Sequence, residues 1–214
     1  MSGLFITFEG GEGAGKTTQI NRLAQSLTAQ GKKVATTREP GGTPEAEKIR
    51  DLLVQRDTGQ WSPLSETLLL FAARTLHVER VIKPNLNDGK IVISDRFTDS
   101  TVAYQGYGHG LDLDIISGLK KTVLNDLEPN LTFILDIDAE SGLTRSERRL
   151  ASEALAIKQK EDRFENLELD FHEKLRNGFL KIAKDNPNRC EVIDATQEID
   201  AIAEQILEKT LTRI

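Results

Sequence analysis

The sequence lacks the features that mark several large classes of protein. Its 214 residues include one cysteine, Cys190, so the chain cannot form an internal disulfide or a cysteine-based metal site. Cys190 lies in an apolar run, where we expect a buried structural thiol. The chain has no positively charged start followed by an apolar signal segment, and no apolar run approaches the roughly 20 residues needed to span a bilayer. We therefore expect a cytoplasmic protein.

Positive charge is in short supply, since 28 Lys and Arg stand against 34 Asp and Glu, a formal net charge of −6. This balance argues against a general nucleic-acid binder, because such proteins gain affinity by neutralising phosphates with Lys and Arg. Any anionic ligand must be held by local charge. We find no internal repeat and no low-complexity tract, and 38% apolar residues suffice for one sizeable core. The prediction is a single domain over residues 1–214.

Five short apolar runs alternate with longer helical patterns, which predicts an α/β fold with a five-stranded parallel sheet flanked by helices. The runs span Leu4–Glu9, Lys33–Arg38, Ile91–Asp95, Leu131–Asp136 and Cys190–Asp194. In such a sheet the ligand crevice lies outside the carboxyl ends of the strands. The candidates for a functional site are therefore the residues that close each run: Glu9, Glu39, Asp95 and Arg96, Asp136, and Asp194.

Two helical patterns between and after these runs are well defined. A long helix is predicted over residues 65–86, apolar on more than one side, so it needs a second partner: the rest of the core or another copy of the chain. A final helix is predicted from Ile199 to Leu211, with Thr196 as a possible N-terminal cap.

Residues Gly10 to Thr17 match the phosphate-loop pattern G-x-x-x-x-G-K-[ST], and they follow the first apolar run. In this motif, backbone N–H groups surround a triphosphate, Lys16 reaches the β and γ oxygens, and Thr17 can ligate Mg²⁺. A helical pattern follows, with Gly31 as its stop, so the phosphate would sit at a helix N-terminus that favours anions. The competing interpretation is a glycine-rich turn that only joins strand to helix.

Charged residues close the second and third runs. The third ends in Asp95 and Arg96, a pair that could be a structural ion pair. Beside a phosphate loop we favour a functional interpretation, in which Arg96 grips a phosphate with two donors and Asp95 holds Mg²⁺ or accepts a hydroxyl proton. The second run leads into Arg38 and a Pro-Gly-Gly turn, which alone is weak evidence.

Aromatic and amide side chains suited to a nucleobase occur in two further segments. Phe71 and Arg74 are three residues apart on a predicted helix, so they are neighbours on its surface. Tyr104 and Gln105 precede a glycine-rich stretch, and the Gln105 amide can both donate to and accept from a pyrimidine edge. Phe71 taken alone would be interpreted as a core aromatic.

Six blocks in order along the chain resemble the bacterial thymidylate kinases: the phosphate loop at 9–18, Arg-Glu-Pro-Gly-Gly-Thr from Arg38, Phe-Ala-Ala-Arg from Phe71, Asp-Arg at Asp95, Ala-Tyr-Gln-Gly from Ala103 and Asp-Arg-Phe-Glu from Asp162. The resemblance implies transfer of the ATP γ-phosphoryl group to dTMP with Mg²⁺, giving dTDP and ADP. It also implies the fold of nucleoside monophosphate kinases, a mobile lid near residues 142–165, and a homodimer.

The resemblance further implies roles for individual residues. Phe71 would stack on thymine, Arg74 and Gln105 would hydrogen-bond its edge, and Tyr104 would crowd the 2′ position. The full set expected to bind dTMP is Glu12, Arg38, Phe71, Arg74, Arg96, Thr101, Tyr104 and Gln105. The set expected to bind ATP is Gly10, Gly11, Glu12, Gly13, Ala14, Gly15, Lys16, Thr17, Thr18, Asp194, Ala195 and Thr196. Thr17 and Asp95 would hold the metal, and the residues expected to act in catalysis are Lys16, Asp95, Arg96, Arg145, Arg148 and Arg149.

The family supplies its transition-state arginine either from the phosphate loop or from the lid. Here the middle of the loop carries Glu12 and Gly13, so we expect the lid to supply it. Arg145, Arg148 and Arg149 have i, i+3, i+4 spacing and would share one helical face, although a charged face of this kind can also simply be solvated. Arg163 is a further candidate.

Two other functions remain open at this point. Another phosphate-loop kinase would act on a different pyrimidine nucleotide or on a deoxynucleoside, although Arg38 and Arg96 favour a phosphorylated acceptor. A nucleotide-driven switch that binds protein partners would need the guanine-reading Asn-Lys-x-Asp segment of GTPases, and the sequence has none.

Overall fold

The computed structural model describes residues 3–55, 59–153, 163–164 and 167–214. Its centre is a five-stranded parallel sheet of β1 (Leu4–Glu9), β2 (Val34–Arg38), β3 (Ile91–Asp95), β4 (Leu131–Asp136) and β5 (Cys190–Asp194), in the order β2-β3-β1-β4-β5. The predicted sheet is confirmed, and the one difference in bounds is that β2 begins at Val34 rather than Lys33.

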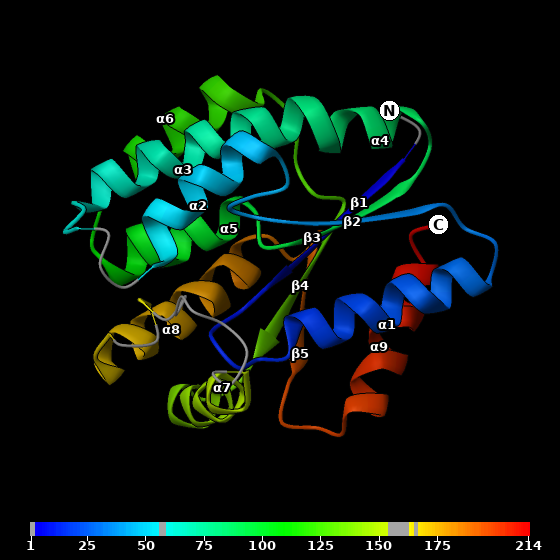
Figure 1. Ribbon diagram of the computed structural model, residues 1–214. Coiled ribbons are helices and arrows are strands. Elements are labelled where there is room, and N and C mark those ends of the chain that lie inside the picture. The colour runs from blue at the N-terminus through cyan, green and yellow to red at the C-terminus, as the bar shows by residue number, and fades with distance from the viewer. Residues whose placement is uncertain (1–2, 56–58, 154–162, 165–166) are drawn as a thin grey trace.

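Helices cover both faces of the sheet (Figure 1). On one face, α1 (Lys16–Ala29) and α9 (Ile199–Leu211) pack on side chains that include Ile6, Phe8 and Phe133. The other elements are α2 (Pro44–Val54), α3 (Pro63–His77), η1 (Val78–Ile82), α4 (Lys83–Asn87), α5 (Thr98–Thr101), η2 (Val102–Gly108), α6 (Leu113–Leu124), α7 (Ala139–Glu153) and α8 (Leu169–Asp185). Two further clusters, one around η1, α4 and Phe5 and one around η2 and α8, fill the opposite face.

The long helix expected over residues 65–86 is present as α3, η1 and α4, which follow one another without a gap. The middle segment, η1, winds as a wider π-helix. The η1 and α4 part supplies Val78, Ile82 and Leu86 to the core, whereas Leu64 and Leu68 on α3 stay 42% and 50% exposed. The apolar pattern on more than one side of this helix therefore has two causes, a core face and an uncovered face.

The predicted stop of α1 is confirmed. Gly31 has φ 77°, its N–H donates to Thr28 O (2.9 Å), and the N–H of Lys32 donates to Leu27 O (3.0 Å). These two bonds form a Schellman motif, in which glycine adopts the left-handed conformation without steric cost.

The expected cap of the last helix is wrong. The N-cap of α9 is Glu198, and Thr196 instead donates both its N–H and its hydroxyl to Asp194 Oδ1, at 2.9 and 2.6 Å. The carboxylate two residues upstream is the nearer acceptor, so Thr196 closes a turn directly after β5 rather than starting the helix.

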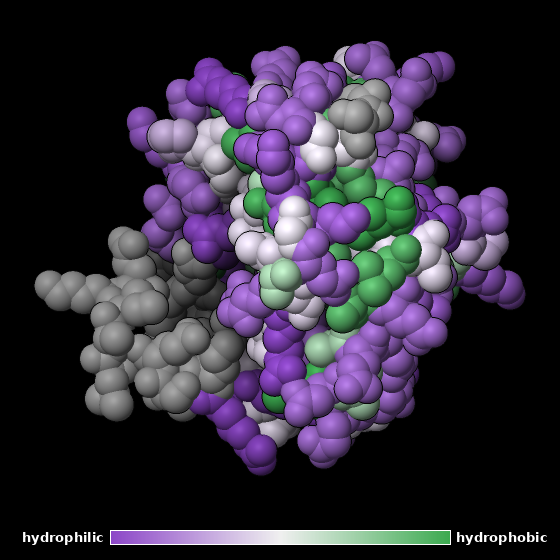
Figure 2. Space-filling model, turned by 90° about the vertical axis from the view of Figure 1, so that its right-hand side faces the viewer, coloured by the Kyte–Doolittle hydropathy of each residue, from purple (hydrophilic) through white to green (hydrophobic). Residues whose placement is uncertain are grey.

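Figure 2 shows the end of the molecule where the strands begin, opposite to their carboxyl ends. This face is mostly hydrophilic, with a group of hydrophobic residues near the centre of the view. A groove there is lined by Leu4, Ile91 and Ile214 together with Lys32 and Lys33. In the part of the chain that the structure describes, no helix has both the length and the apolar composition to cross a bilayer.

Candidate active site

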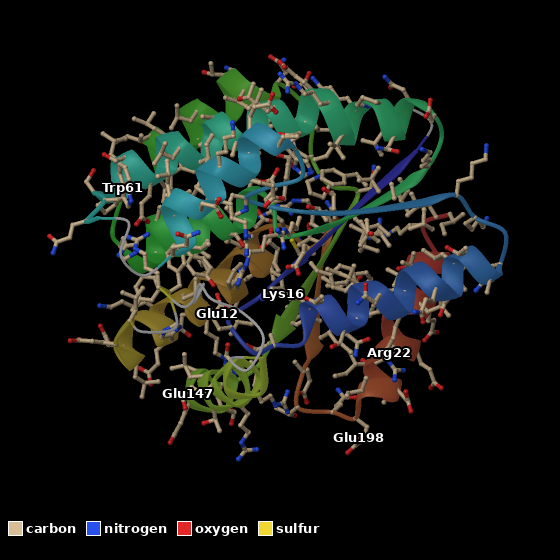
Figure 3. The ribbon with its side chains drawn as sticks, viewed as in Figure 1. Glu12, Lys16, Arg22, Trp61, Glu147 and Glu198 are labelled. Atoms are coloured by element: carbon tan, nitrogen blue, oxygen red, sulfur yellow. The ribbon has the colours of Figure 1, made fainter. Side chains whose placement is uncertain are left out.

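The phosphate loop joins β1 to α1 at the carboxyl end of the sheet (Figure 3). The first helical residue is Lys16, which is 8% exposed and whose ammonium donates to the carbonyl oxygens of Gly10 (3.1 Å) and Gly11 (2.8 Å). Burial and the neighbouring Arg96 lower the pKa of Lys16, against the attraction of Glu12. The loop thus curls around its own lysine, with a 14-residue helix directly behind it.

The loop touches α7 directly, through two glycines. Gly13 has φ 67°, and a Cβ added there would lie 2.0 Å from the carbonyl oxygen of Gly142. A Cβ on Gly142 would in turn lie 2.6 Å from the carbonyl oxygen of Glu12. No side chain fits at either position, so α7 can approach the phosphate loop only because both residues are glycine.

Arg96 is the centre of a charged cluster beside the loop. Its φ of 68° is unusual for a residue other than glycine and costs about 1–2 kcal/mol. The guanidinium donates to Gly10 O (3.0 Å), Ser100 Oγ (3.1 Å), Glu12 Oε1 (2.8 Å) and Tyr104 Oη (2.9 Å). The Tyr104 hydroxyl also donates to Glu12. Strained backbone of this kind is common at functional sites.

The electrostatics of this cluster favour an ionised Glu12. Burial opposes ionisation, but Arg96 and Lys16 outweigh it and lower the pKa of Glu12 to about 2. Burial opposes the charge of Arg96, but Tyr104, Glu12 and the nearby carboxylates of Asp95 and Glu9 prevail and raise its pKa. Glu12 and Arg96 therefore stay charged together at the mouth of the loop.

Thr17 and Asp95 form the oxygen donor set expected for a divalent cation. The Thr17 hydroxyl donates to Asp95 Oδ2 at 3.0 Å, which places one hydroxyl and one carboxylate next to the loop. Among the described residues there is no group of three or more His, Cys, Asp or Glu that could hold a metal by itself. This donor set suits Mg²⁺, which is typically bound by one or two carboxylates plus substrate phosphates.

Phe71, Arg74, Thr101 and Gln105 meet in a buried layer between α3 and the α5–η2 segment, and each is at most 2% exposed. The Arg74 guanidinium lies 4.8 Å from the centroid of the Phe71 ring, and its Nη2 donates to Thr101 Oγ1 (3.0 Å). Two atoms of this layer are buried without a hydrogen-bond partner: Arg74 Nη1 and Gln105 Oε1. Such orphaned polar atoms are costly unless a ligand satisfies them.

Three buried residues behind this layer were given no role from the sequence, although Glu39 was among the candidates at the strand ends. Glu39 accepts from Arg74 Nε (2.7 Å) and pairs with His77 Nδ1 (2.8 Å), and Glu66 accepts from Gln105 Nε2 (3.0 Å). Burial opposes the charge of Glu39, but Arg74 and His77 prevail and lower its pKa. The only signal in the sequence was their position, since Glu39 follows Arg38 and Glu66 interrupts an apolar helical pattern.

The structure places some predicted residues on other partners. Arg38 pairs with Glu47 on α2 (3.0 Å), and both side chains are partly exposed, at 53% and 39%. Arg163 donates to Leu53 O (2.9 Å) and contacts Glu66. It therefore joins the residues behind Gln105.

The predicted adenine-side loop and the lid meet at one contact. Arg145 Nη1 on α7 donates to Ala195 O (2.9 Å), next to the turn of Asp194 and Thr196. Arg148 is exposed on the same helix. The Arg149 side chain and, within the expected lid, residues 154–162 and 165–166 lie outside what the structure describes.

A cavity extends from the phosphate loop between β4, α7 and α8. Its lining includes Gly11, Glu12, Asp136, His172 and Arg176. His172 Nε2 is buried without a partner, and burial lowers the pKa of this imidazole although Glu12 acts in the opposite direction. Arg176 forms a two-pronged pair with Asp136, at 2.7 and 2.8 Å.

Comparisons with known proteins agree with this geometry. The family model for thymidylate kinase matches residues 8–206. Thymidylate kinase of Caulobacter vibrioides is 50% identical over 212 residues, which is 99% of this chain and 98% of the relative. Thymidylate kinase of Bartonella quintana is 50% identical over 207 residues, 96% of this chain and 94% of the relative. The crystal structure of thymidylate kinase from Ehrlichia chaffeensis superposes with a TM-score of 0.77 at 37% identity and covers 99% of both chains.

Proposed function

We propose how the residues of this chain, which belongs to the thymidylate kinase family and phosphorylates dTMP to dTDP, share the reaction with ATP as the co-substrate. The observation that carries the assignment of roles is the pairing of a phosphate loop with a buried layer whose two orphaned atoms, Arg74 Nη1 and Gln105 Oε1, face no protein partner. The phosphate loop binds the donor nucleotide, and the buried layer reads the base of the acceptor.

On the donor side, residues 10–18 hold the ATP phosphates, with Lys16 moving from loop carbonyls to phosphate oxygens. Thr17 and Asp95 would hold Mg²⁺, which would neutralise charge on the phosphates. The turn of Asp194, Ala195 and Thr196 borders the adenine. Because Arg145 bonds Ala195 O, α7 would be linked to the bound nucleotide.

On the acceptor side, Phe71 stacks on thymine while Arg74, Thr101 and Gln105 surround its polar edge. Tyr104 crowds the 2′ position and Glu12 lies near the 3′-hydroxyl; the hydrogen bond between them is consistent with neighbouring positions on one sugar. Arg96 and Arg38 bind the dTMP phosphate. Arg38 can turn toward it because its only described partner, Glu47, is a partly exposed one.

The transferring phosphoryl group needs positive charge from both sides, since catalysis here depends on positioning and electrostatic stabilisation. We assign this positive charge to two groups of residues. Lys16 and Arg96 supply it from beside the phosphate loop, and the lid arginines of α7 supply it from the other side: Arg145, Arg148 and Arg149. Gly13 and Gly142 set how closely the lid helix can come. The lid is taken as residues 142–165 of a single domain.

The test is an assay of ADP release with ATP, Mg²⁺ and a panel of acceptors. We expect turnover with dTMP to exceed that with dCMP, UMP or thymidine by at least tenfold. A preference for one of the other acceptors would favour a different nucleotide or nucleoside kinase. Equal ATP consumption with and without an acceptor would favour a nucleotide-driven switch.

A homodimer is part of the proposal. The adjoining helices α2, α3 and α6 expose Leu52, Leu64, Leu68, Leu113 and Ile115, each at 39–50%. Burying such a surface against a second copy removes apolar area from water. Light scattering is expected to give twice the mass of the chain, and Leu68→Asp to give a monomer; a monomeric wild type would refute the dimer. We further place the protein in the cytoplasm, where its single thiol, buried at Cys190, would stay reduced.

A further inference from the structure

Glu66 is a carboxylate in an unusual place. It lies on α3 at 1% exposure, and burying a charge is costly unless it is paired and hydrogen-bonded. Both of its oxygens have partners: Oε2 accepts from Gln105 Nε2 at 3.0 Å, and Oε1 contacts the guanidinium of Arg163. Arg163 is itself held by Leu53 O at 2.9 Å. The chain has therefore built a complete buried contact around a single acid, and the catalytic scheme above does not use it.

The contact fixes which way the Gln105 amide points. An ionised carboxylate can only accept hydrogen bonds, so the amide nitrogen of Gln105 must face Glu66 and the amide oxygen must face away. That oxygen, Gln105 Oε1, is the one left buried and without a partner. Gln105 is 1% exposed and donates its amide to Glu66, so turning the amide over would bring two oxygens together.

Arg74 presents the complementary atom. Its Nε donates to Glu39 (2.7 Å) and its Nη2 to Thr101 Oγ1 (3.0 Å) and Phe97 O (3.2 Å), which leaves Nη1 as a bare donor. The Glu66–Gln105 pair and the Arg74–Thr101 pair both join α3 to the α5–η2 segment. Glu66 and Arg74 are two turns apart on α3, and their partners Gln105 and Thr101 are about one turn apart across η2 and α5. The layer thus offers one fixed donor and one fixed acceptor beside Phe71.

This pattern matches one class of pyrimidine and mismatches the other. Thymine and uracil carry a keto oxygen at position 4, an acceptor, next to N3–H, a donor. Cytosine reverses both, with an amino donor at position 4 and an acceptor at N3. A site whose polar groups stay unpaired with the wrong ligand rejects it strongly. We propose that Glu66 is a specificity-determining positioning residue, which holds Gln105 as an acceptor and so makes the site prefer 4-keto over 4-amino pyrimidine nucleotides.

The inference rests on the proposed role of Arg74 and Gln105 in reading the base, so the experiment separates the two. Wild type, Glu66→Gln, Gln105→Ala and Glu45→Gln are compared for kcat/KM with dTMP and with dCMP at saturating ATP. Glu45→Gln is the matched control, because Glu45 also pairs with an arginine, Arg80 at 2.8 Å, but is 49% exposed and lies outside the site. A glutamine at position 66 can donate as well as accept, so it no longer dictates the orientation of Gln105.

We expect Glu66→Gln to lower the dTMP/dCMP ratio of kcat/KM by at least tenfold, through a higher KM for dTMP and a gain for dCMP, with KM for ATP unchanged. A role confined to stability would leave the ratio where it is. If Glu66→Gln keeps the ratio within twofold while Gln105→Ala lowers it, the inference about Glu66 is wrong and the proposed reading of the base stands. If Gln105→Ala also leaves the ratio unchanged, the proposed reading of the base fails first.

If Glu66→Gln does not fold, as judged by its thermal unfolding, the wild-type protein answers the same question. A through-hydrogen-bond NMR coupling between the side-chain nitrogen of Gln105 and the carboxyl carbon of Glu66 is expected. The Gln105 signal is identified by its loss in Gln105→Ala. Absence of this coupling in the dTMP complex would overturn the inference.

Discussion

The ion pair between Arg189 and Asp99 gives the sharpest prediction about stability. Arg189 directly precedes β5 and donates Nη1 to Asp99 Oδ2 (2.6 Å) and Nη2 to Asp99 Oδ1 (2.9 Å), while Nη1 also reaches Thr132 Oγ1 (3.0 Å). The two side chains are 13% and 5% exposed. Burial opposes the charge of Arg189, but the bonds to Asp99 prevail and raise its pKa. The pair ties β5 to α5, the short helix that follows Arg96.

Replacing Arg189 by methionine leaves the Asp99 carboxylate buried without its cation. Breaking one side of a buried ion pair costs about 3–5 kcal/mol. In a chain of this size each 1 kcal/mol lowers Tm by about 2–4 °C, so Tm should fall by roughly 6–20 °C. Replacing both residues, as Arg189→Met with Asp99→Leu, removes the charges together and should recover most of this loss, because an apolar pair of similar volume is often as stable as the ion pair.

Urea unfolding of the wild type, the two single variants and the double variant measures the coupling directly. We expect each single variant to lose several kcal/mol and the double variant to lose far less than their sum. A loss below about 1 kcal/mol in Arg189→Met would show that the contact is only a surface-type salt bridge. Additive losses in the double variant would show that the two side chains act independently, and either result would refute the reasoning.

Three further predictions concern the loop, a buried acid and the lid. In Gly13→Ala the new Cβ would lie 2.0 Å from the carbonyl oxygen of Gly142 on α7. We expect kcat/KM for ATP to fall at least tenfold, with little change in folding as monitored by fluorescence. Near-normal kinetics would count against contact between the phosphate loop and α7. Burial raises the pKa of Glu9 from 4.5 to about 7, so the stability that its protonated form contributes is present at low pH and is lost as pH rises from about 4.5 through 7. In urea titrations over this window, the unfolding free energy of the wild type should fall by on the order of 3 kcal/mol relative to that of Glu9→Gln. Parallel curves of unfolding free energy against pH for the two proteins would contradict this. Alanine at the acting lid arginine should lower kcat by about 10³ or more. If Arg145→Ala, Arg148→Ala, Arg149→Ala and Arg163→Ala all stay within about tenfold of wild type in steady-state assays, the lid does not supply the cation.

Most of the fold could be predicted because its signals are local. The sheet follows from apolar runs of strand length, and the end of α1 follows from one residue, Gly31, whose left-handed conformation permits two specific hydrogen bonds. Thr196 shows where local reasoning fails. A threonine before a helix can cap it or close an Asx-type turn, and Asp194, two residues upstream, decided between the two.

The site divides in the same way. The phosphate loop and the pairs that flank it are contiguous in sequence, so their placement could be predicted from motif and strand order. Glu39, Glu66 and His77 could not, because their meaning depends on partners 35 to 39 residues away in the chain. From the sequence, a charged residue within an apolar helical pattern is interpreted as lying on the solvent-exposed face of the helix. Only the fold shows that this face is buried.

Three cationic side chains of the site are held by protein oxygens. Lys16 donates to loop carbonyls, Arg96 to Glu12 and Arg38 to Glu47. Without these oxygens, the cationic side chains at this edge of the sheet would repel one another. Binding of phosphate is therefore an exchange of oxygen partners rather than the pairing of free charges, and the net gain per contact is small. Such an exchange makes affinity depend on how many contacts are remade at once.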